Sequence, residues 1–179
     1  MKAADVNTRP DAGIGPVVSS AHLAQSARPA LSEVEFALTM ATHAFQRWIV
    51  RCMAAAGAPG LSPLEVLILH QVAHRDRAKT LADLCLVLNI EDTHLASYAI
   101  KKLAAQALVL TGRKGKEKTV AISAKGAEIC ARYGRIREAL VVGGLPRGDG
   151  DGAGLSELAA LLRGLSGSYD QAARAAAAL

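Results

Sequence analysis

The stretch of residues 80–125 constrains the fold of this chain most, because it places two helix signals and a hairpin signal in a fixed order. The run Thr80-Leu81-Ala82-Asp83 has the pattern of a helix cap, in which a hydroxyl accepts a backbone N–H and an acidic residue meets the helix dipole. After a short break, a second helix is predicted at about residues 91–107. Two segments at 108–113 and 118–123 then predict a β-hairpin. This order is typical of a helix-turn-helix followed by a wing.

Positive charge is concentrated in the same stretch. Between residues 101 and 118 there are six basic residues and one acidic residue, Glu117, so the local excess of five equals the formal net charge of +5 of the whole chain. Such a concentration favours an anionic partner and predicts a surface that binds the phosphates of double-stranded DNA. The basic residues are Lys101, Lys102, Arg113, Lys114, Lys116 and Lys118.

The second predicted helix has a polar face near its N-terminus. If its apolar residues Ala96, Ala99, Ile100 and Leu103 face the core, the residues that project outward are Thr93, His94, Ser97, Tyr98 and Lys101. Side chains of these types can reach base edges in a major groove about 12 Å wide. The alternative is a solvated helix face beside a structural turn.

The tip of the hairpin, residues 113–118, is basic and centred on Gly115, which permits a tight turn. A thin cationic tip fits a minor groove or runs along phosphates. The alternative is an ordinary hairpin edge that lysines protect against aggregation. Because the hairpin directly follows a helix-turn-helix, we favour contact with DNA.

Composition and apolar spacing divide the chain into four parts. The first is rich in Ala, Ser, Gly and Pro, and we expect it to be flexible. Order is expected to begin at Ser32, where the run Ser32-Glu33-Val34-Glu35 has the pattern of a capping box. The predicted parts are a tail at 1–30, a dimerisation helix at 31–58, a winged helix-turn-helix DNA-binding domain at 61–123, and C-terminal dimerisation helices at 124–179 with a Gly-rich loop at 143–154.

Capping signals also mark the helices between these boundaries. Ser62-Pro63-Leu64-Glu65 predicts a helix that continues to about His74, followed by a charged surface turn at residues 75–79. Ser123 is expected to cap a helix that ends near Val142. The fold class is therefore mostly α with a small β-hairpin wing.

Narrow apolar stripes run along the first and last predicted helices. Their members recur every three or four residues, which is the spacing of helices that pack as coiled coils. Because a small winged helix cannot cover both stripes, we predict a homodimer held by both ends of the chain; the alternative is packing within one chain. The stripes are Val34, Leu38, Ala41, Phe45, Trp48 and Cys52, and Leu155, Leu158, Leu162, Leu165, Tyr169, Ala172, Ala176 and Leu179.

The sequence offers little for catalysis or for a cofactor. It has no P-loop, GxGxxG, GxSxG or paired-carboxylate pattern, so we expect neither an enzyme nor a cofactor. His70 and His74 are spaced i, i+4, but no third ligand is evident, and no metal site is predicted. A metal sensor, or a redox sensor acting through Cys52 or Cys130, on the same scaffold is kept as an alternative.

The location follows from the same composition. The three cysteines, Cys52, Cys85 and Cys130, are widely spaced and form no disulfide framework, which suits a reducing cytosol. No apolar run reaches the roughly 18 residues of a membrane span, and the N-terminus lacks the apolar core of a signal peptide. A cytoplasmic protein without membrane contact is therefore predicted.

Four motifs in order give the chain a resemblance to a known family. They are Leu61–Leu67 (LSPLEVL), Thr80–Leu84 (TLADL), Ile100–Val109 (IKKLAAQALV) and Val120–Gly126 (VAISAKG). The last looks like VxLTxxG with Ser for Thr. The chain thus resembles the MarR family of bacterial transcriptional regulators over nearly its whole ordered length, and the specificity lies in the order and spacing of the motifs.

The resemblance implies a homodimer in which helix 1 and the last two helices build the interface. It also implies that a small-molecule effector binds between the dimer and DNA-binding domains and shifts the spacing of the two recognition helices. Phe45, Trp48 and His70 are the candidates for lining such a pocket; the alternative is that Phe45 and Trp48 belong to the dimer core.

Two departures from the family pattern affect the expected DNA contacts. The wing carries Lys114 and Lys116 where the family usually has Asp-x-Arg, and Lys lacks the planar fork of Arg. Wing contacts are therefore expected to be weaker or made to phosphate alone. Ala107 stands where Gly is common. A winged-helix protein-interaction module that has lost DNA binding is the competing hypothesis.

Overall fold

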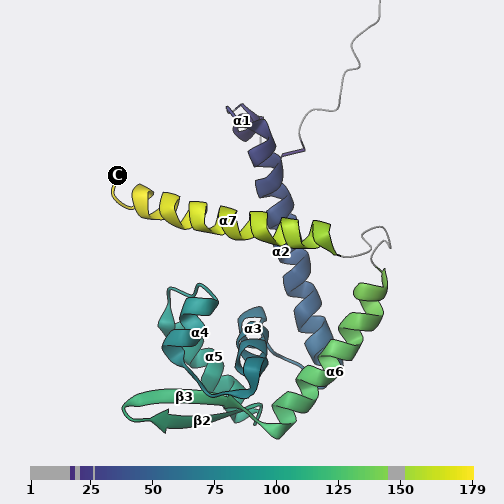
Figure 1. Cartoon of the computed structure of the whole chain (residues 1–179), viewed down its shortest axis with the longest axis vertical. Coiled ribbons are helices and arrows are strands. Elements are labelled where there is room, and N and C mark those ends of the chain that lie inside the picture. Colours follow the sequence, from purple (N-terminus) through teal and green to yellow (C-terminus); the bar gives the residue numbers. More distant parts are fainter. Residues whose placement is uncertain (1–16, 19–20, 26, 145–151) are drawn as a thin grey trace, which may run out of the picture. The chain divides into compact units, whose positions relative to one another are not determined.

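The computed structural model describes residues 17–18, 21–25, 27–144 and 152–179 (Figure 1). The predicted fold class is confirmed, since the described chain is mostly helical with one small antiparallel sheet. It divides into two compact units, Met1–Ile136 and Arg137–Leu179, and we describe each by itself. Among the described residues, no helix combines the length and the apolar character needed to span a membrane.

The N-terminal helices begin earlier than the sequence predicts. A short helix α1 spans Ala21–Ala24, inside the segment expected to be a tail, and α2 spans Pro29–Ala55. Most of the predicted tail lies outside the described residues. The predicted capping box at Ser32 is wrong, because Ser32 lies within α2 and its Oγ donates to the carbonyl of Leu23 at 2.5 Å. Pro29, with φ already fixed at a helical value, occupies the first helical position instead.

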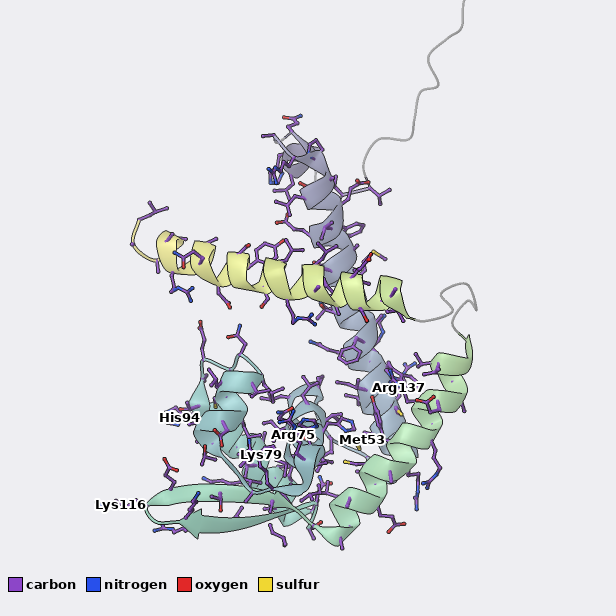
Figure 2. The ribbon with its side chains drawn as sticks, viewed as in Figure 1. Met53, Arg75, Lys79, His94, Lys116 and Arg137 are labelled. Carbon is purple, nitrogen blue, oxygen red and sulfur yellow. The ribbon has the colours of Figure 1, made fainter. Side chains whose placement is uncertain are left out.

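Three helices form the body of the first unit: α3 (Pro63–Ala73), α4 (Leu81–Val87) and α5 (Thr93–Ala105). The predicted caps of α3 and α4, at Ser62 and Thr80, are both confirmed, and each is a capping box. The last turns of α2 complete the core, and Met53 there is fully buried (Figure 2). The largest fully buried side chains of this core are Ile49, Met53, Ile68, Leu69, Leu84, Leu103 and Leu108.

The sheet has three strands in the order β1-β3-β2, with both pairs antiparallel. The hairpin strands β2 (Val109–Lys114) and β3 (Glu117–Ile122) lie within one residue of the predicted segments. The sequence did not predict β1 (Lys79–Thr80), which pairs with Val120 and Thr119 of β3. Two residues are too few for an alternating pattern. Strand β1 therefore connects the wing to the start of α4.

The chain before β1 differs from the predicted surface turn. A 3-10 turn, η1, spans His74–Asp76, and Arg75 takes the left-handed conformation with φ 62°. Lys79 is 5% exposed. Its Nζ donates to the carbonyl of His74 and, at 3.3 Å each, to those of Val72 and Arg77. The lysine therefore turns inward, because the carbonyl groups left at the end of α3 need donors.

Ser123 caps the next helix, α6 (Ala124–Leu140), as predicted. Its Oγ accepts from the backbone N–H of Gly126 at 2.9 Å and donates to the carbonyl of Ala107 at 2.7 Å. A 3-10 turn, η2, spans Val142–Gly144, and residues 145–151 of the Gly-rich loop lie outside the described residues. The last helix, α7, spans Ala153–Ala176, and none of its residues is buried.

The end of α5 is a Schellman motif built on an alanine. The N–H of Leu108 donates to the carbonyl of Leu103 at 3.0 Å, and the N–H of Ala107 donates to that of Ala104 at 2.9 Å. Ala107 has φ 57°, a left-handed conformation that costs an alanine about 1–2 kcal/mol. The alanine that stands here in place of the family's common glycine therefore strains the backbone locally.

Replacing Ala107 with glycine is expected to raise the free energy of unfolding by about 1 kcal/mol, because glycine adopts this conformation without steric cost. Urea denaturation followed by circular dichroism measures the change. The matched control is Ala131→Gly at an exposed position inside α6, which should lower stability by about 1 kcal/mol. Equal effects of the two substitutions would contradict the strain at Ala107.

Candidate nucleic-acid interface

The predicted division of α5 into an inner and an outer face is confirmed. Ala96, Ala99, Ile100 and Leu103 are buried in the core. Thr93, His94, Tyr98 and Lys101 are exposed, and Ser97 is half-buried. The carboxylate of Asp92 accepts from the backbone N–H of His94 at 2.8 Å and caps the helix. Because this cap fixes where α5 begins, it also fixes the direction in which its first outward side chains project (Figure 2).

The wing presents its cations around a tight turn. Lys114 and Glu117 lie opposite each other at the end of the strands, and Gly115 between them has φ 62°. Lys116 stands at the tip of the hairpin (Figure 2). The four wing cations named from the sequence are all exposed; they are Arg113, Lys114, Lys116 and Lys118.

A groove of about 430 Å³ separates α5 from the wing. Lys101 from α5 and Arg113 and Lys118 from the wing strands line it, and Ile100 and Val120 contribute apolar surface. The structure thus brings together three of the predicted cations from both sides of one groove. Hydroxyl groups supply further hydrogen-bonding partners in the same lining, from Ser97, Thr111 and Thr119.

Lys102 differs from the other predicted cations. Its Nζ lies 3.0 Å from Oε2 of Glu65 and donates to the carbonyl of Gly60 at 3.0 Å. Glu65 is buried, and the same Oε2 accepts from the backbone N–H of Ser62 at 2.8 Å. Lys102 therefore connects α5 to the N-terminus of α3 and positions the outer face of α5. We do not count it among the cations free for phosphate.

One exposed residue of α5 was missed by the sequence reasoning. Leu95 is 56% exposed, beside Tyr98, which is 68% exposed. A leucine on a helix is ordinarily assigned to the core, and only the positions of Ala96, Ala99 and Ile100 show that Leu95 lies off the buried face.

The three predicted effector residues have different surroundings in the described part of the chain. Phe45 is 52% exposed on α2, whereas Trp48, one turn further along, packs against the core. The ring of His70 meets Tyr133 edge-on, with 4.4 Å between ring centroids. Its buried Nε2 has no hydrogen-bond partner among the described residues, and burial lowers the pKa of His70. His70 is therefore part of the contact between α3 and α6.

The structure also provides evidence on the two alternative functions, a metal sensor and a redox sensor. Among the described residues, no group of three His, Cys, Asp or Glu side chains could hold a metal ion. Burial raises the pKa of Cys52, and raises that of Cys130 to about 11. Thiols with raised pKa values form little of the reactive thiolate near neutral pH, which disfavours a redox sensor at these positions.

Comparisons with known proteins agree with this architecture. Residues 61–126 match a family model described as a winged helix DNA-binding domain. The transcriptional regulator BldR from Sulfolobus solfataricus superposes with a TM-score of 0.60 at 19% sequence identity, covering 82% of this chain and 99% of that chain. A MarR transcriptional regulator from Methanosarcina mazei superposes with a TM-score of 0.53 at 18% identity, covering 74% and 90%.

The chain has a MarR-like winged-helix fold. A third structure with this fold is CouR from Rhodococcus jostii RHA1, bound to p-coumaroyl-CoA. It superposes with a TM-score of 0.58 at 12% identity, covering 74% of this chain and 90% of that chain. No curated protein matches the sequence significantly. The MarR-like fold extends beyond the winged helix itself, since the superpositions cover nine-tenths or more of each of these three chains.

Proposed function

We propose that this chain is a homodimeric, sequence-specific DNA-binding transcription regulator that acts in the cytoplasm without catalysis. In this proposal α5 enters the major groove and the wing runs along the backbone or the minor groove. The observation that carries the proposal is the groove between α5 and the wing, which has cations on both sides and lies in a winged-helix domain.

The cations and the other exposed side chains of this surface have different roles in the proposed binding to DNA. Lys101, Arg113 and Lys118 line the groove, and Lys114 and Lys116 extend the positive surface to the wing tip. Cations of this kind bind phosphates and position the protein, whereas the side chains at the N-terminus of α5 contact base edges. Thr93, His94, Ser97 and Tyr98 are the proposed base-contacting residues.

Two exposed apolar surfaces support a homodimer. On α2, Val34 and Phe45 of the predicted apolar stripe are exposed. On α7, Leu155, Leu158 and Leu162 are exposed along one stripe of a helix that has no buried residue. Burial of such stripes against a second copy would remove apolar surface from water. A two-fold dimer would then present two copies of α5 to half-sites about one helical turn apart.

An effector site is a further part of the proposal. CouR, which shares the fold, binds p-coumaroyl-CoA. In this chain Phe45, Trp48 and His70 are the proposed pocket residues, and Phe45 and Trp48 are also suited to the dimer core. An effector that binds one arrangement of the dimer more tightly would shift the population between DNA-competent and incompetent forms.

The wing lysines provide a quantitative test. The double substitution Lys114→Gln and Lys116→Gln is expected to weaken binding to all duplex sequences, because the lost contacts are to phosphate. The slope of log affinity against log salt concentration should fall by about 0.9 for each lost contact, or about 1.8 in all for each bound protomer. Fluorescence anisotropy with a labelled random-sequence duplex at several salt concentrations measures it.

The matched control is Arg47→Gln with Arg51→Gln, which removes the same charge from exposed positions on α2. This variant should keep the wild-type salt slope. A wing variant whose slope equals that of the wild type would remove the wing from the proposed interface.

A protein-interaction module that has lost DNA binding is the second candidate. It is favoured by the wing, which lacks the Asp-x-Arg pattern, and by Leu86 and Val87, two exposed apolar residues on α4. The same anisotropy titration separates the candidates. Salt-dependent binding of the random duplex supports a DNA-binding protein, and no binding at low salt supports the interaction module.

A further inference from the structure

The outer face of α5 is poor in the side chains that usually identify guanine and adenine. In the major groove, Arg and Lys pair with guanine, Asn and Gln pair with adenine, and apolar groups contact the C5-methyl group of thymine. Helix α5 (Thr93–Ala105) contains no Arg, Asn or Gln. Of its two lysines, Lys102 is bonded to Glu65 and Gly60. Hydrogen-bonded base readout by this helix therefore depends on a small set of groups.

Two large, partly or wholly apolar side chains are exposed on the same face. Tyr98 follows Leu95 by three positions (i, i+3), so their side chains are neighbours on the helix surface. Both are more than half exposed, and both lie near the N-terminus of α5, the part of a recognition helix that contacts bases. The backbone N–H of the neighbouring His94 donates to the carboxylate of Asp92, which caps the helix. The apolar pair is thus presented at the point where the helix is expected to meet the groove.

We infer that Leu95 and Tyr98 read thymine through its C5-methyl group, and that contacted thymines are a main source of sequence specificity for this protein. The inference rests on the proposed DNA-binding function and names the base that the recognition helix selects. Contact with methyl groups would bury both side chains, which accounts for an exposed leucine on a polar helix face outside the core.

Replacement of thymine by uracil tests this directly, because it removes the methyl group and leaves base pairing intact. The full chain is first used to select duplexes from a random library. The best duplex is then made with thymine or with uracil throughout, and the dissociation constant of each is measured by anisotropy. Wild-type protein should bind the uracil duplex about fourfold more weakly for each contacted methyl group, and about fifteenfold more weakly when each of two half-sites loses one.

Two variants separate a direct contact from an effect of uracil on the shape of the duplex. Leu95→Ala should show a smaller difference between its affinities for the thymine and uracil duplexes than the wild type, because one of the two apolar contacts with methyl groups is lost and that of Tyr98 remains. Leu86→Ala is the matched control, since Leu86 is 82% exposed in the same domain but lies on α4. This control should keep the wild-type ratio, and circular dichroism should show that both variants are folded.

The outcomes separate the inference from the function on which it rests. Equal wild-type affinity for the thymine and uracil duplexes, with sequence-specific binding retained, overturns thymine readout and leaves the DNA-binding function standing. A ratio that persists unchanged in Leu95→Ala overturns the role of Leu95. Failure of the full chain to enrich any duplex in the selection, at any salt concentration, overturns the proposed function itself.

Discussion

Alanine in place of Gly126 is expected to lower the free energy of unfolding by about 3 kcal/mol or more. A Cβ atom at this position would lie 2.1 Å from the carbonyl oxygen of Leu108 and 2.7 Å from Cδ1 of Ile122. The carbonyl of Leu108 cannot move freely, because it accepts from the backbone N–H of Ser123 at 3.2 Å and shares the Ser123 hydroxyl hydrogen with the carbonyl of Ala107. The substitution must therefore separate α6 from the start of the wing.

Gly134 on the same helix supplies the control. Apart from its chain neighbours and the backbone of its own helix, an alanine Cβ there would meet no described atom within 4 Å. Because alanine favours the helix over glycine, Gly134→Ala should raise stability by up to about 1 kcal/mol. Urea denaturation of both variants gives the comparison, and a Gly126→Ala protein as stable as the Gly134→Ala protein would show that α6 does not approach Leu108 closely.

Methionine in place of Lys79 is expected to lower the free energy of unfolding by about 2–3 kcal/mol. Methionine fills a similar volume but donates no hydrogen bond, so the carbonyl groups of Val72, His74 and Arg77 lose a charged donor (Figure 2). The loss of hydrogen bonds from a buried charged donor has a cost of about this size. Because Lys79 belongs to β1, the substitution should also loosen the attachment of the wing.

Lys125 offers the same chemistry at the surface. Its exposed Nζ donates to the carbonyl of Gln106 at the end of α5, at 2.9 Å. Water replaces this donor when Lys125 becomes methionine, so that change should alter stability by less than about 0.5 kcal/mol. Chemical denaturation again measures both variants. Equal losses at Lys79 and Lys125 would indicate that burial does not strengthen the interaction.

The elements that local sequence determines were predicted well. The capping boxes at Ser62 and Thr80 place the starts of α3 and α4, because each cap uses residues three apart in the chain. The inner face of α5 follows from helical spacing alone. The resemblance to MarR regulators anticipated Gly126 as a motif residue, and the close approach of Leu108 supplies its physical reason.

The elements that depend on distant contacts were not predictable. Ser32 has the right neighbours for a cap, yet Pro29 starts α2 first and the Ser32 hydroxyl bonds to Leu23. The burial of Lys79 requires the end of α3 and strand β3 together. The sequence alone predicts Lys102 to be a free cation, whereas in the structure it forms an ion pair with Glu65 of α3. In each case the deciding partner comes from another element, which no local pattern contains.

Selection of duplexes from a random DNA library by the purified full chain tests DNA recognition, symmetry and half-site spacing together. We expect enrichment of a two-fold symmetric sequence with half-sites about one helical turn apart, bound by a dimer. Recovery of unenriched random sequence, or of a single half-site bound by a monomer, would contradict the proposal that paired copies of α5 and the wing read DNA.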